Sequence, residues 1–300
     1  MSVVECSGLT KAFGSTVAVD DLSFSLPADK ITGLIGRNGA GKTTLLKLIA
    51  GYLVPTGGTL KVFSEDPFNN VNTSANIIFI DDNMTMPASM NLAEILESVG
   101  SFYGNWDRKL ALGLFEYFNL NPRQYHNNLS KGMKSTFNMI LGIAARCPLT
   151  IFDEPTVGMD AAVRKDFYRA LLKDFMQYPR AIFFSSHLLN EINEILDDIL
   201  LLNEGKSHLH MPKDEVKEFA VALQGKDQVV AEVIGSSEIF YRKKLGKENL
   251  YVVVRNRFPE EALSGARRKG VEVSAVAADD LCVYLTAKHK GGIDDVFDRN

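Results

Sequence analysis

The sequence predicts an α/β protein whose core is a mostly parallel sheet flanked by helices, with antiparallel strands at its start. Three observations support this prediction. Short apolar segments alternate with helix-length segments over about residues 1–218. A helical stretch interrupts this alternation between about residues 87 and 146. Further strand-like segments after residue 219 predict a small α+β appendage over residues 219–300.

Composition fits an ordinary soluble globular chain of one large domain or two smaller ones. Its 300 residues are 46% hydrophobic and 23% charged. The net charge of −4 argues against a general nucleic-acid binder, so we expect no nucleic acid among the partners. The three cysteines lie far apart without metal-ligand spacing, which indicates free thiols in a reducing compartment.

No apolar stretch approaches the ~20 residues that a membrane-spanning helix needs. The first residues also lack the basic and apolar regions of a signal peptide. We therefore expect a cytosolic chain, unless a partner holds it at a membrane.

The elements before the helical insert are predicted from short apolar runs bounded by turn residues. In chain order they are the strands Val3–Leu9, Leu22–Leu26 and Ile31–Ile35, the helix Leu45–Ala50, and the strands Thr59–Phe63 and Asn76–Ile80. In the insert, Leu92, Ile95, Leu96 and Val99 recur at helical spacing. The insert is therefore predicted to form a separate helical subdomain.

After the insert, strands and helices alternate again. They are predicted at Leu149–Phe152, Ala161–Phe175, Ala181–Ser185, Leu189–Leu196 and Ile199–Leu202, before a short strand and helix over Gly205–Glu218. In the appendage, strands are predicted at Val229–Ile234, Leu250–Val254 and Val271–Val276, with a helix at Pro259–Arg268. Such alternation in the core indicates parallel strands joined by helical crossovers.

The segment from Gly36 to Thr44 has the pattern G-x-x-x-x-G-K-T between a strand and a helix, which is the context of a phosphate-binding P-loop. Its glycines let backbone N–H groups turn toward phosphate oxygens at the positive end of the next helix. Lys42 would add a charge, and Thr43 would offer its hydroxyl to Mg²⁺. The residues expected to bind the nucleotide are Gly36, Asn38, Gly39, Ala40, Gly41, Lys42, Thr43 and Thr44. The alternative is an ordinary glycine turn.

A second candidate element is the apolar strand from Leu149 that ends in Asp153 and Glu154. Asp153 would hold Mg²⁺ through its water shell. Glu154 would orient or deprotonate the attacking water. Without a P-loop upstream, the same pattern would equally describe a solvated turn.

Between these two elements lies Leu129-Ser130-Lys131-Gly132-Met133, followed by a predicted helix. Ser130 is a good N-cap residue, and Gly132 lets another backbone approach closely. The segment would therefore form an anion-binding helix terminus. Capping without any ligand is the commoner meaning of this short pattern.

The order of these elements resembles the ATP-binding subunit of ABC transporters over about residues 1–218. By this resemblance, Gly36–Thr44 is the Walker A motif, Leu129–Met133 the signature and Leu149–Glu154 the Walker B strand. Val157–Asp160 resembles the D-loop, so that Asp160 would contact nucleotide.

The resemblance also assigns two single side chains. His187 would be the switch histidine that contacts the γ-phosphate, and Phe13 would stack on adenine. A polar strand end and a core phenylalanine are the respective alternatives.

Two departures from the family pattern stand out. Asp82 lies where the family usually has Gln; its carboxylate would still reach Mg²⁺ but adds negative charge. Lys131 and Met133 replace the usual Gly and Gln of the signature. Similar Lys-Gly-Met signatures occur in bacterial exporters, which favours export.

The resemblance implies an ATP- and Mg²⁺-dependent ATPase that powers transport. Two such subunits, identical or paralogous, would pair head to tail, with Ser130 and Gly132 of one covering ATP on the other. Transmembrane permease subunits would dock on the helical lobe near Asp82 and hold the chain at the cytoplasmic face of the membrane. The alternatives are a soluble ABC-type ATPase of DNA repair or translation, and a regulatory module that rarely hydrolyses ATP. The appendage would brace a dimer, contact the membrane partner or regulate.

Overall fold

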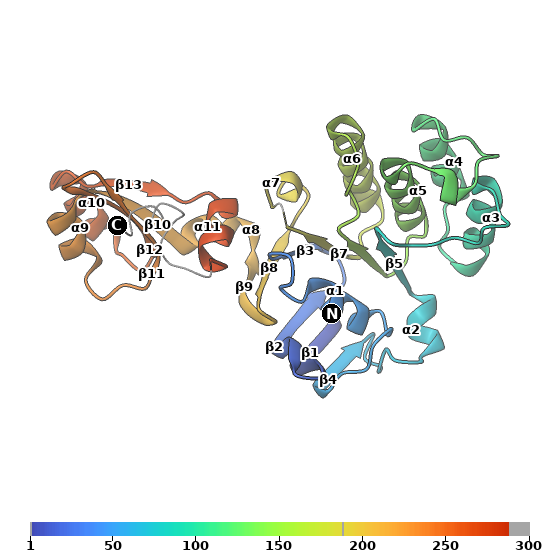
Figure 1. Ribbon diagram of the computed structural model, residues 1–300, viewed down its shortest axis with the longest axis horizontal. Coiled ribbons are helices and arrows are strands. Elements are labelled where there is room, and N and C mark those ends of the chain that lie inside the picture. Colours follow the sequence, from blue (N-terminus) through green and yellow to red (C-terminus); the bar gives the residue numbers. More distant parts are fainter. Residues whose placement is uncertain (1, 188, 288–300) are drawn as a thin grey trace. The chain divides into compact units, whose positions relative to one another are not determined.

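The computed structural model describes residues 2–187 and 189–287, and its chain divides into two compact units, Met1–His210 and Met211–Asn300 (Figure 1). The sequence places the boundary after Glu218 instead. Helix α8 (Lys213–Phe219) accounts for the difference, since it contacts strand β10 (Ala220–Lys226) of the second unit. The last part of the predicted appendage, residues 288–300, lies outside the described residues.

A six-stranded sheet with the order β5-β6-β7-β3-β8-β9 forms the centre of the first unit. Its strands are β3 (Ile31–Ile35), β5 (Ile77–Asp81), β6 (Leu149–Asp153), β7 (Ala181–Ser186), β8 (Asp198–Asn203) and β9 (Lys206–Pro212). The pairs β5–β6, β6–β7, β3–β7 and β3–β8 are parallel, which confirms the predicted sheet. Their carboxyl ends therefore share one edge, where the polar strand-end residues gather.

An antiparallel sheet with the order β2-β1-β4 lies beside this core, as predicted. Its strands are β1 (Ser2–Phe13), β2 (Thr16–Pro27) and β4 (Gly57–Val62), and α1 (Lys42–Ile49) contacts both β2 and β4 as well as β6. Leu45 and Leu46 of α1 belong to one buried hydrophobic cluster with Ile151 of β6. The short helix α2 (Val71–Ala75) precedes β5. Helix α1 is thus held between two sheets, and its first residue, Lys42, is positioned by both.

The helical insert contains α3 (Leu92–Phe102), α4 (Arg108–Tyr117), a 3₁₀ turn at His126–Asn128, and α5 (Lys131–Ala144). Figure 1 shows these helices in green, on the opposite face of the central sheet from β1 and β2. Helix α3 begins with a capping box formed by Asn91 and Glu94. Helix α5 is buried from Ser135 to Ala144 and contacts α4, α6 (Ala161–Gln177) and strands β5 and β6. Its N-terminus, which carries the signature residues, is therefore rigidly supported.

Helix α7 (Leu189–Ile192) is shorter than the predicted Leu189–Leu196, and Ile195 and Leu196 are buried beyond its end. Leu196 packs closely against strand β3, since a Cβ built at Gly33 of that strand would lie 2.4 Å from Leu196 Cδ1. Tertiary burial of these apolar side chains thus replaces the expected further helical turn.

After α8, the second unit has the element order β10, α9, β11, β12, α10, β13, α11, and its sheet has the order β11-β12-β10-β13. Its further elements are α9 (Asp227–Ile234), β11 (Ile239–Leu245), β12 (Asn249–Arg255), α10 (Glu260–Arg268), β13 (Glu272–Ala275) and α11 (Ala278–Leu285). The strand pairs β10–β12, β10–β13 and β11–β12 are antiparallel. The β-α-β-β-α-β order is that of a ferredoxin-like fold.

One prediction for the second unit is wrong, because Val229–Ile234 belongs to helix α9 instead of a strand. Val230 and Ile234 are four residues apart and both buried, which is helical spacing. Asp227 in the first turn and Gly235 at the C-cap also favour a helix. Strands β10 and β11 and helix α11 were not predicted, whereas β12, α10 and β13 agree with the sequence.

Within the described residues, no helix is both long and apolar enough to cross a bilayer. Cys6, Cys147 and Cys282 are free and buried. Burial raises the pKa of the Cys6 thiol to about 11 and that of Cys147 to about 12, so neither is suited to act as a nucleophile.

His126 is a buried polar residue beneath the signature segment, and it is 3% exposed. Its Nε2 lies 3.0 Å from Asn138 Oδ1 of α5, whereas its buried Nδ1 has no hydrogen-bond partner. Burial lowers the pKa of the imidazole, and the charge of Lys134 lowers it further, although the hydrogen bond to Asn138 opposes this. The folded protein therefore favours neutral His126.

This burial predicts an acid-dependent loss of stability. Below the ordinary histidine pKa of about 6.5 the unfolded chain binds the proton more readily, so the free energy of unfolding falls as pH drops through that value toward the lower folded pKa. Chemical denaturation of wild type and His126→Gln at pH 7.5 and 5.0 should show the steeper loss in wild type. His208→Gln, at an exposed position, is the control and should follow wild type. Equal pH dependence in His126→Gln and wild type would contradict the prediction.

Candidate nucleotide-binding site

The loop from Gly36 to Gly41 joins β3 to α1 at the carboxyl edge of the central sheet. Gly39 and Gly41 have positive φ angles of 82° and 102°, which favour glycine because a Cβ would be strained there. Gly41 is the N-cap of α1, and no side chain caps the helix. The first backbone N–H groups of α1 are therefore available to an anion.

Close backbone packing also requires glycine at two positions of this loop. A Cβ at Gly36 would lie 2.4 Å from the Leu202 carbonyl oxygen, and one at Gly41 would lie 2.2 Å from that of Ala18. Ala40 is buried, whereas Arg37, Asn38 and Gly39 are exposed. Strands β8 and β2 thus anchor the loop, while its tip faces solvent. An exposed loop with free backbone N–H groups fits a bound triphosphate.

Lys42 is a buried charged residue at the start of α1, with 6% of its surface exposed. Its Nζ donates to the carbonyl oxygens of Gly36 at 2.7 Å and Arg37 at 3.4 Å. The same Nζ lies 3.3 Å from Glu154 Oε1. The lysine is therefore held over the loop and toward the strand-end carboxylates.

Asp153 and Glu154 are joined through a residue that the sequence left without a role, Ser185. Asp153 of β6 and Ser185 of β7 are register partners. Ser185 Oγ donates to Asp153 Oδ1 at 2.6 Å and accepts the Glu154 backbone N–H at 2.9 Å. The signal was its position two residues before His187, at the end of the predicted strand Ala181–Ser185.

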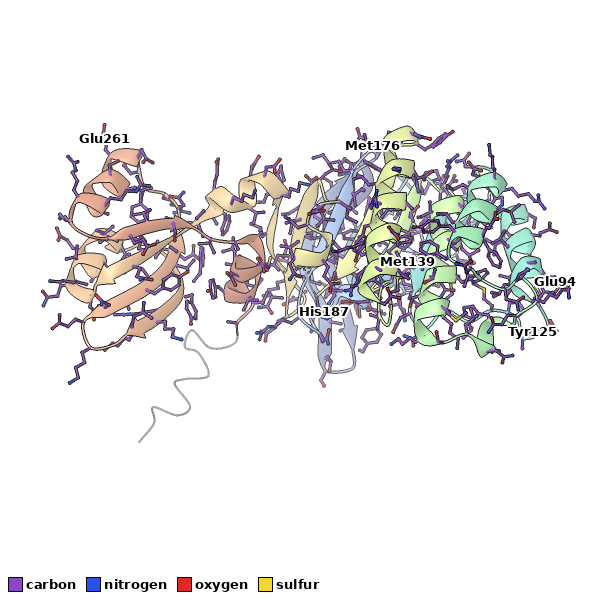
Figure 2. The ribbon with its side chains drawn as sticks, turned by 90° about the horizontal axis from the view of Figure 1, so that it is seen from above. Glu94, Tyr125, Met139, Met176, His187 and Glu261 are labelled. Carbon is purple, nitrogen blue, oxygen red and sulfur yellow. The ribbon has the colours of Figure 1, made fainter. Side chains whose placement is uncertain are left out.

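Glu154 has an unusual backbone conformation, with φ at 47°. Positive φ is uncommon for a long side chain and persists where surrounding contacts hold it. Its Oε2 lies 2.9 Å from His187 Nδ1, and its Oε1 is buried with the Lys42 ion pair but no hydrogen bond. Figure 2 labels His187 beside the strands of the central sheet. The structure thus brings together Lys42, Glu154 and His187, three residues that the sequence assigned to one site.

The oxygen donors around this cluster fit Mg²⁺, which prefers carboxylate, hydroxyl, phosphate and water oxygens. Thr43 is exposed in the first turn of α1, and Asp153 is 5% exposed at the end of β6. Asp81, the register partner of Asp153, was not assigned. Burial raises the pKa of its carboxyl, and the charges of Asp153 and Asp82 raise it further. A cation at this edge would relieve their mutual repulsion.

Asp82, the predicted third metal ligand, is engaged elsewhere in this structure. Its Oδ2 lies 3.3 Å from Lys131 Nζ, and its Oδ1 accepts from the Asn83 side chain at 2.8 Å. Thus Asp82 faces the signature segment, whereas Asp81 is the carboxylate in register with Asp153.

The signature residues form a second cluster around the D-loop. Ser130 caps α5 by accepting the Met133 N–H at 3.3 Å, and Asp160 caps α6 by accepting two N–H groups at 2.9 Å. A Cβ at Gly132 would lie 2.5 Å from the Gly158 carbonyl oxygen. Within residues 2–187 and 189–287, no hydrogen bond or ion pair connects Ser130 or Gly132 to the P-loop. These two clusters are thus separate parts of the predicted site.

Phe13 lies at the end of β1 and is 50% exposed, with Lys11 Nζ 5.0 Å from its ring centroid. It is therefore not a core residue, and its ring remains accessible for stacking on a base.

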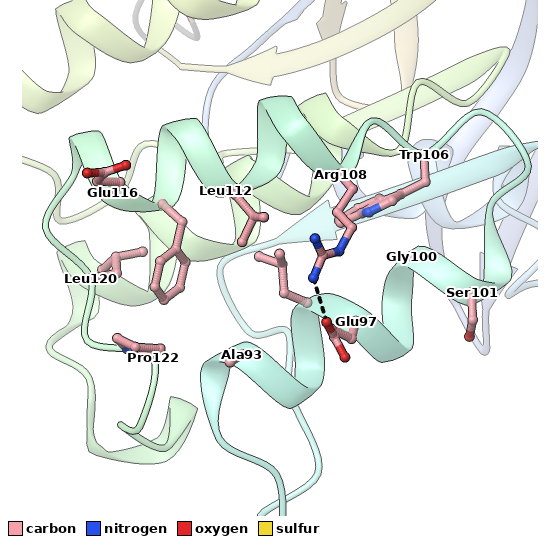
Figure 3. Close-up of a pocket in the computed structure, with 12 residues that line it drawn as sticks. Ala93, Glu97, Gly100, Ser101, Trp106, Arg108, Leu112, Glu116, Leu120 and Pro122 are labelled. Carbon is pink, nitrogen blue, oxygen red and sulfur yellow. Dashed lines mark hydrogen bonds and ion pairs between the residues drawn. The ribbon is translucent and has the colours of Figure 1, made fainter.

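The helical lobe contains a separate groove of about 750 Å³ between α3 and α4 (Figure 3). Its apolar lining includes Leu96, Leu112, Phe115, Leu120 and Trp106. At its rim, Arg108 Nη2 and Glu97 Oε1 form an ion pair of 2.8 Å. The groove lies away from the phosphate-binding residues and fits an apolar partner surface.

Comparison with known proteins supports this interpretation of the site. The family model described as ABC transporter matches residues 19–157, which include the P-loop, the signature and the strand-end carboxylates. The bacitracin transport ATP-binding protein BcrA of Enterococcus faecalis is 31% identical over 245 residues, covering 78% of this chain and 79% of that protein.

Two further relatives share slightly fewer identical residues with this chain. The ABC transporter ATP-binding protein YtrB of Bacillus subtilis is 27% identical, covering 74% of this chain and 76% of that protein. The daunorubicin/doxorubicin resistance ATP-binding protein DrrA of Streptomyces peucetius is 28% identical, covering 68% of this chain and 63% of that protein. A solved ATP-binding subunit of an ABC transporter has the same fold, with a TM-score of 0.66 at 22% identity over 72% of this chain and 92% of that one.

The two hydrogen bonds of the Ser185 hydroxyl, to Asp153 and from the Glu154 N–H, can be tested by substitution. Ser185→Ala should lower kcat for ATP hydrolysis about tenfold, because a hydrogen bond to a charged group contributes about 1.5–3 kcal/mol and orients both carboxylate residues. The Kd for ATP should change less than about twofold, since the P-loop contacts remain. Ser23→Ala, which removes an exposed hydrogen bond to Gly8, is the control. A fall in affinity with unchanged kcat would contradict the proposed orientation of the carboxylates.

Proposed function

The chain belongs to the family of ABC transporter ATP-binding proteins, and from this premise we propose that it is the Mg²⁺-dependent ATPase subunit of an exporter. The observation that carries the catalytic part is the joining of Lys42, Glu154 and His187 by contacts of 3.3 and 2.9 Å. An ordinary glycine turn or a solvated Asp-Glu turn would not place these three groups together.

In the proposed reaction, water attacks the γ-phosphorus of ATP and the bond to the β-phosphate oxygen breaks, which leaves ADP and inorganic phosphate. Glu154 orients the water and accepts its proton, and His187 holds the Glu154 carboxylate in position. Lys42 and the N-terminus of α1 bind the phosphates. Thr43 and Asp153 are the proposed ligands of Mg²⁺, which would neutralise charge on the phosphates. Asp82, the third ligand expected from the sequence, is paired with Lys131 instead.

The signature cluster supports a composite site formed by two subunits. Ser130 is exposed at the N-terminus of a 14-residue helix, and the P-loop makes no polar contact with it within the described part of the chain. Donors on a second subunit, itself a copy of this chain or a paralogue, would complete the γ-phosphate contacts. ATP would then favour the closed pair and hydrolysis would favour the open one. Asp160 would reach the nucleotide across this same interface, and Phe13 would stack on its base.

We also propose that transmembrane permease subunits dock on the helical lobe, which holds the chain at the cytoplasmic face of the membrane. The apolar groove between α3 and α4 supports this, since an amphipathic helix would bury its apolar face there. Export is supported by the Lys-Gly-Met signature and by the similarity to a drug resistance protein, because resistance by transport requires outward movement. The second unit, whose start the sequence placed at residue 219, would serve as an accessory domain.

Two substitutions test the ATPase. Lys42→Ala should abolish ATP binding, whereas Glu154→Gln should keep binding, lower turnover at least 100-fold by removing the general base, and trap an ATP-bound dimer. Phosphate release and size-exclusion chromatography with Mg-ATP measure both effects. Glu97→Gln, at an exposed surface ion pair, is the control. Unchanged hydrolysis in Glu154→Gln would disprove its role as the base.

Transport coupling is tested in membranes. Inside-out vesicles that carry the chain with its co-purified membrane partner should accumulate substrate when ATP is added, because export moves substrate toward the vesicle lumen. Vesicles with Glu154→Gln are the control and should accumulate none. ATP-dependent release from preloaded vesicles would instead indicate import.

A further inference from the structure

Asp82 and Lys131, which both depart from the family pattern, contact each other. Asp82 follows strand β5, and Lys131 is the first residue of α5, beyond the two intervening helices of the insert. Lys131 Nζ lies 3.3 Å from Asp82 Oδ2. An ion pair thus joins the segment after β5 to the signature helix, at the two positions where the family usually has uncharged residues.

The stem of Lys131 makes a second contact, with the D-loop. A Cβ built at Gly158 would lie 3.0 Å from Lys131 Cγ and 3.3 Å from its Cβ. Gly158 has a φ of 84°, and Ser135 of α5 donates to the neighbouring Val157 carbonyl at 2.8 Å. Lys131 therefore packs against the D-loop through its methylene groups and reaches the end of β5 with its ammonium group.

The charges on both sides make this pair favourable. Lys131 lies at the positive end of the α5 dipole, and the first turn of that helix contains no acidic residue. On the other side, Asp82 adjoins Asp81, which is in register with Asp153. Each partner thus relieves a local excess of like charge. Because Lys131 is 57% and Asp82 28% exposed at the side chain, the pair itself adds little to folding stability.

We infer that Lys131 is a positioning residue, which holds the signature N-terminus, the D-loop and the segment at Asp82 in one arrangement. This inference rests on the proposed function, in which Ser130 and Gly132 of one subunit face the nucleotide of the other. The ion pair links the segment after β5 to the N-terminus of α5. A movement of Asp82 is therefore transmitted to Ser130 and Gly132, which close the composite site. Loss of the ammonium group then lowers catalysis by the dimer but leaves ATP binding at the P-loop intact.

A double-mutant cycle on the full chain tests this inference. Lys131→Met keeps the methylene stem and removes the charge, and it should lower kcat for Mg-ATP about tenfold, with Kd for ATP changed less than about twofold. In the Asp82→Asn background the same substitution should have no further effect, because the pair is already broken. Lys131→Arg keeps both contacts and should retain kcat within about twofold.

Controls separate the possible causes. Arg169→Met breaks an exposed ion pair with Asp166 on α6, away from the signature and the groove, and should leave kcat unchanged. Thermal unfolding of each variant shows whether it is folded. If Lys131→Met is unstable, Lys131→Gln replaces it in the double-mutant cycle. ATP-induced dimerisation in the Glu154→Gln background provides a second readout if turnover is too low to measure.

The outcomes distinguish this inference from the proposed function. Wild-type hydrolysis that Lys42→Ala abolishes establishes the ATPase independently of Lys131. Wild-type kcat in Lys131→Met, or an equal decrease of kcat in the wild-type and Asp82→Asn backgrounds, would overturn the positioning role.

Discussion

The hydrogen bond from Ser185 Oγ to Asp153 Oδ1, 2.6 Å long, fixes the end of β6, and the candidate site depends on it. The same hydroxyl accepts the Glu154 N–H and so supports a residue whose φ of 47° would otherwise be unfavourable. This strained turn directs the Glu154 side chain back toward Lys42 and His187. Three segments distant in sequence, after β3, β6 and β7, therefore meet because parallel strands end at one edge.

The P-loop depends on a second constraint, the close packing of backbone around it. Gly36 touches the backbone of Leu202, and Gly41 touches that of Ala18, so that β8 and β2 hold the loop from two sides. The antiparallel N-terminal sheet therefore helps to hold the loop in its conformation. Its role is to anchor α1, whose N-terminus is left without a side-chain cap.

The signature segment and the loop Val157–Asp160 form a second cluster that is held by contacts of its own. Gly132 packs on Gly158, Ser135 bonds to Val157, and Lys131 extends this cluster to Asp82. The separation of this cluster from the P-loop is what the proposed second subunit would bridge.

Local signals in the sequence determined much of this protein: the P-loop, the strand that ends in Asp153 and Glu154, the parallel core and the helical insert. These predictions succeed because glycine spacing, apolar runs and N-cap residues act within a few positions of the chain. They failed at Val229–Ile234, where adjacent valines suggested a strand although the spacing of the buried side chains is helical. Short apolar runs are ambiguous in this way, since burial depends on distant partners.

Only the tertiary structure decided which side chains contact each other. Ser185 received no role from the sequence because its importance comes from register with Asp153 on a neighbouring strand. Asp82 and Lys131 were two unrelated departures until the fold placed their charges 3.3 Å apart. The sequence by itself determined the chemistry available and its local framework. The fold determined the pairings, because hydrogen bonds and ion pairs act over a few ångströms in space, whatever the distance along the chain.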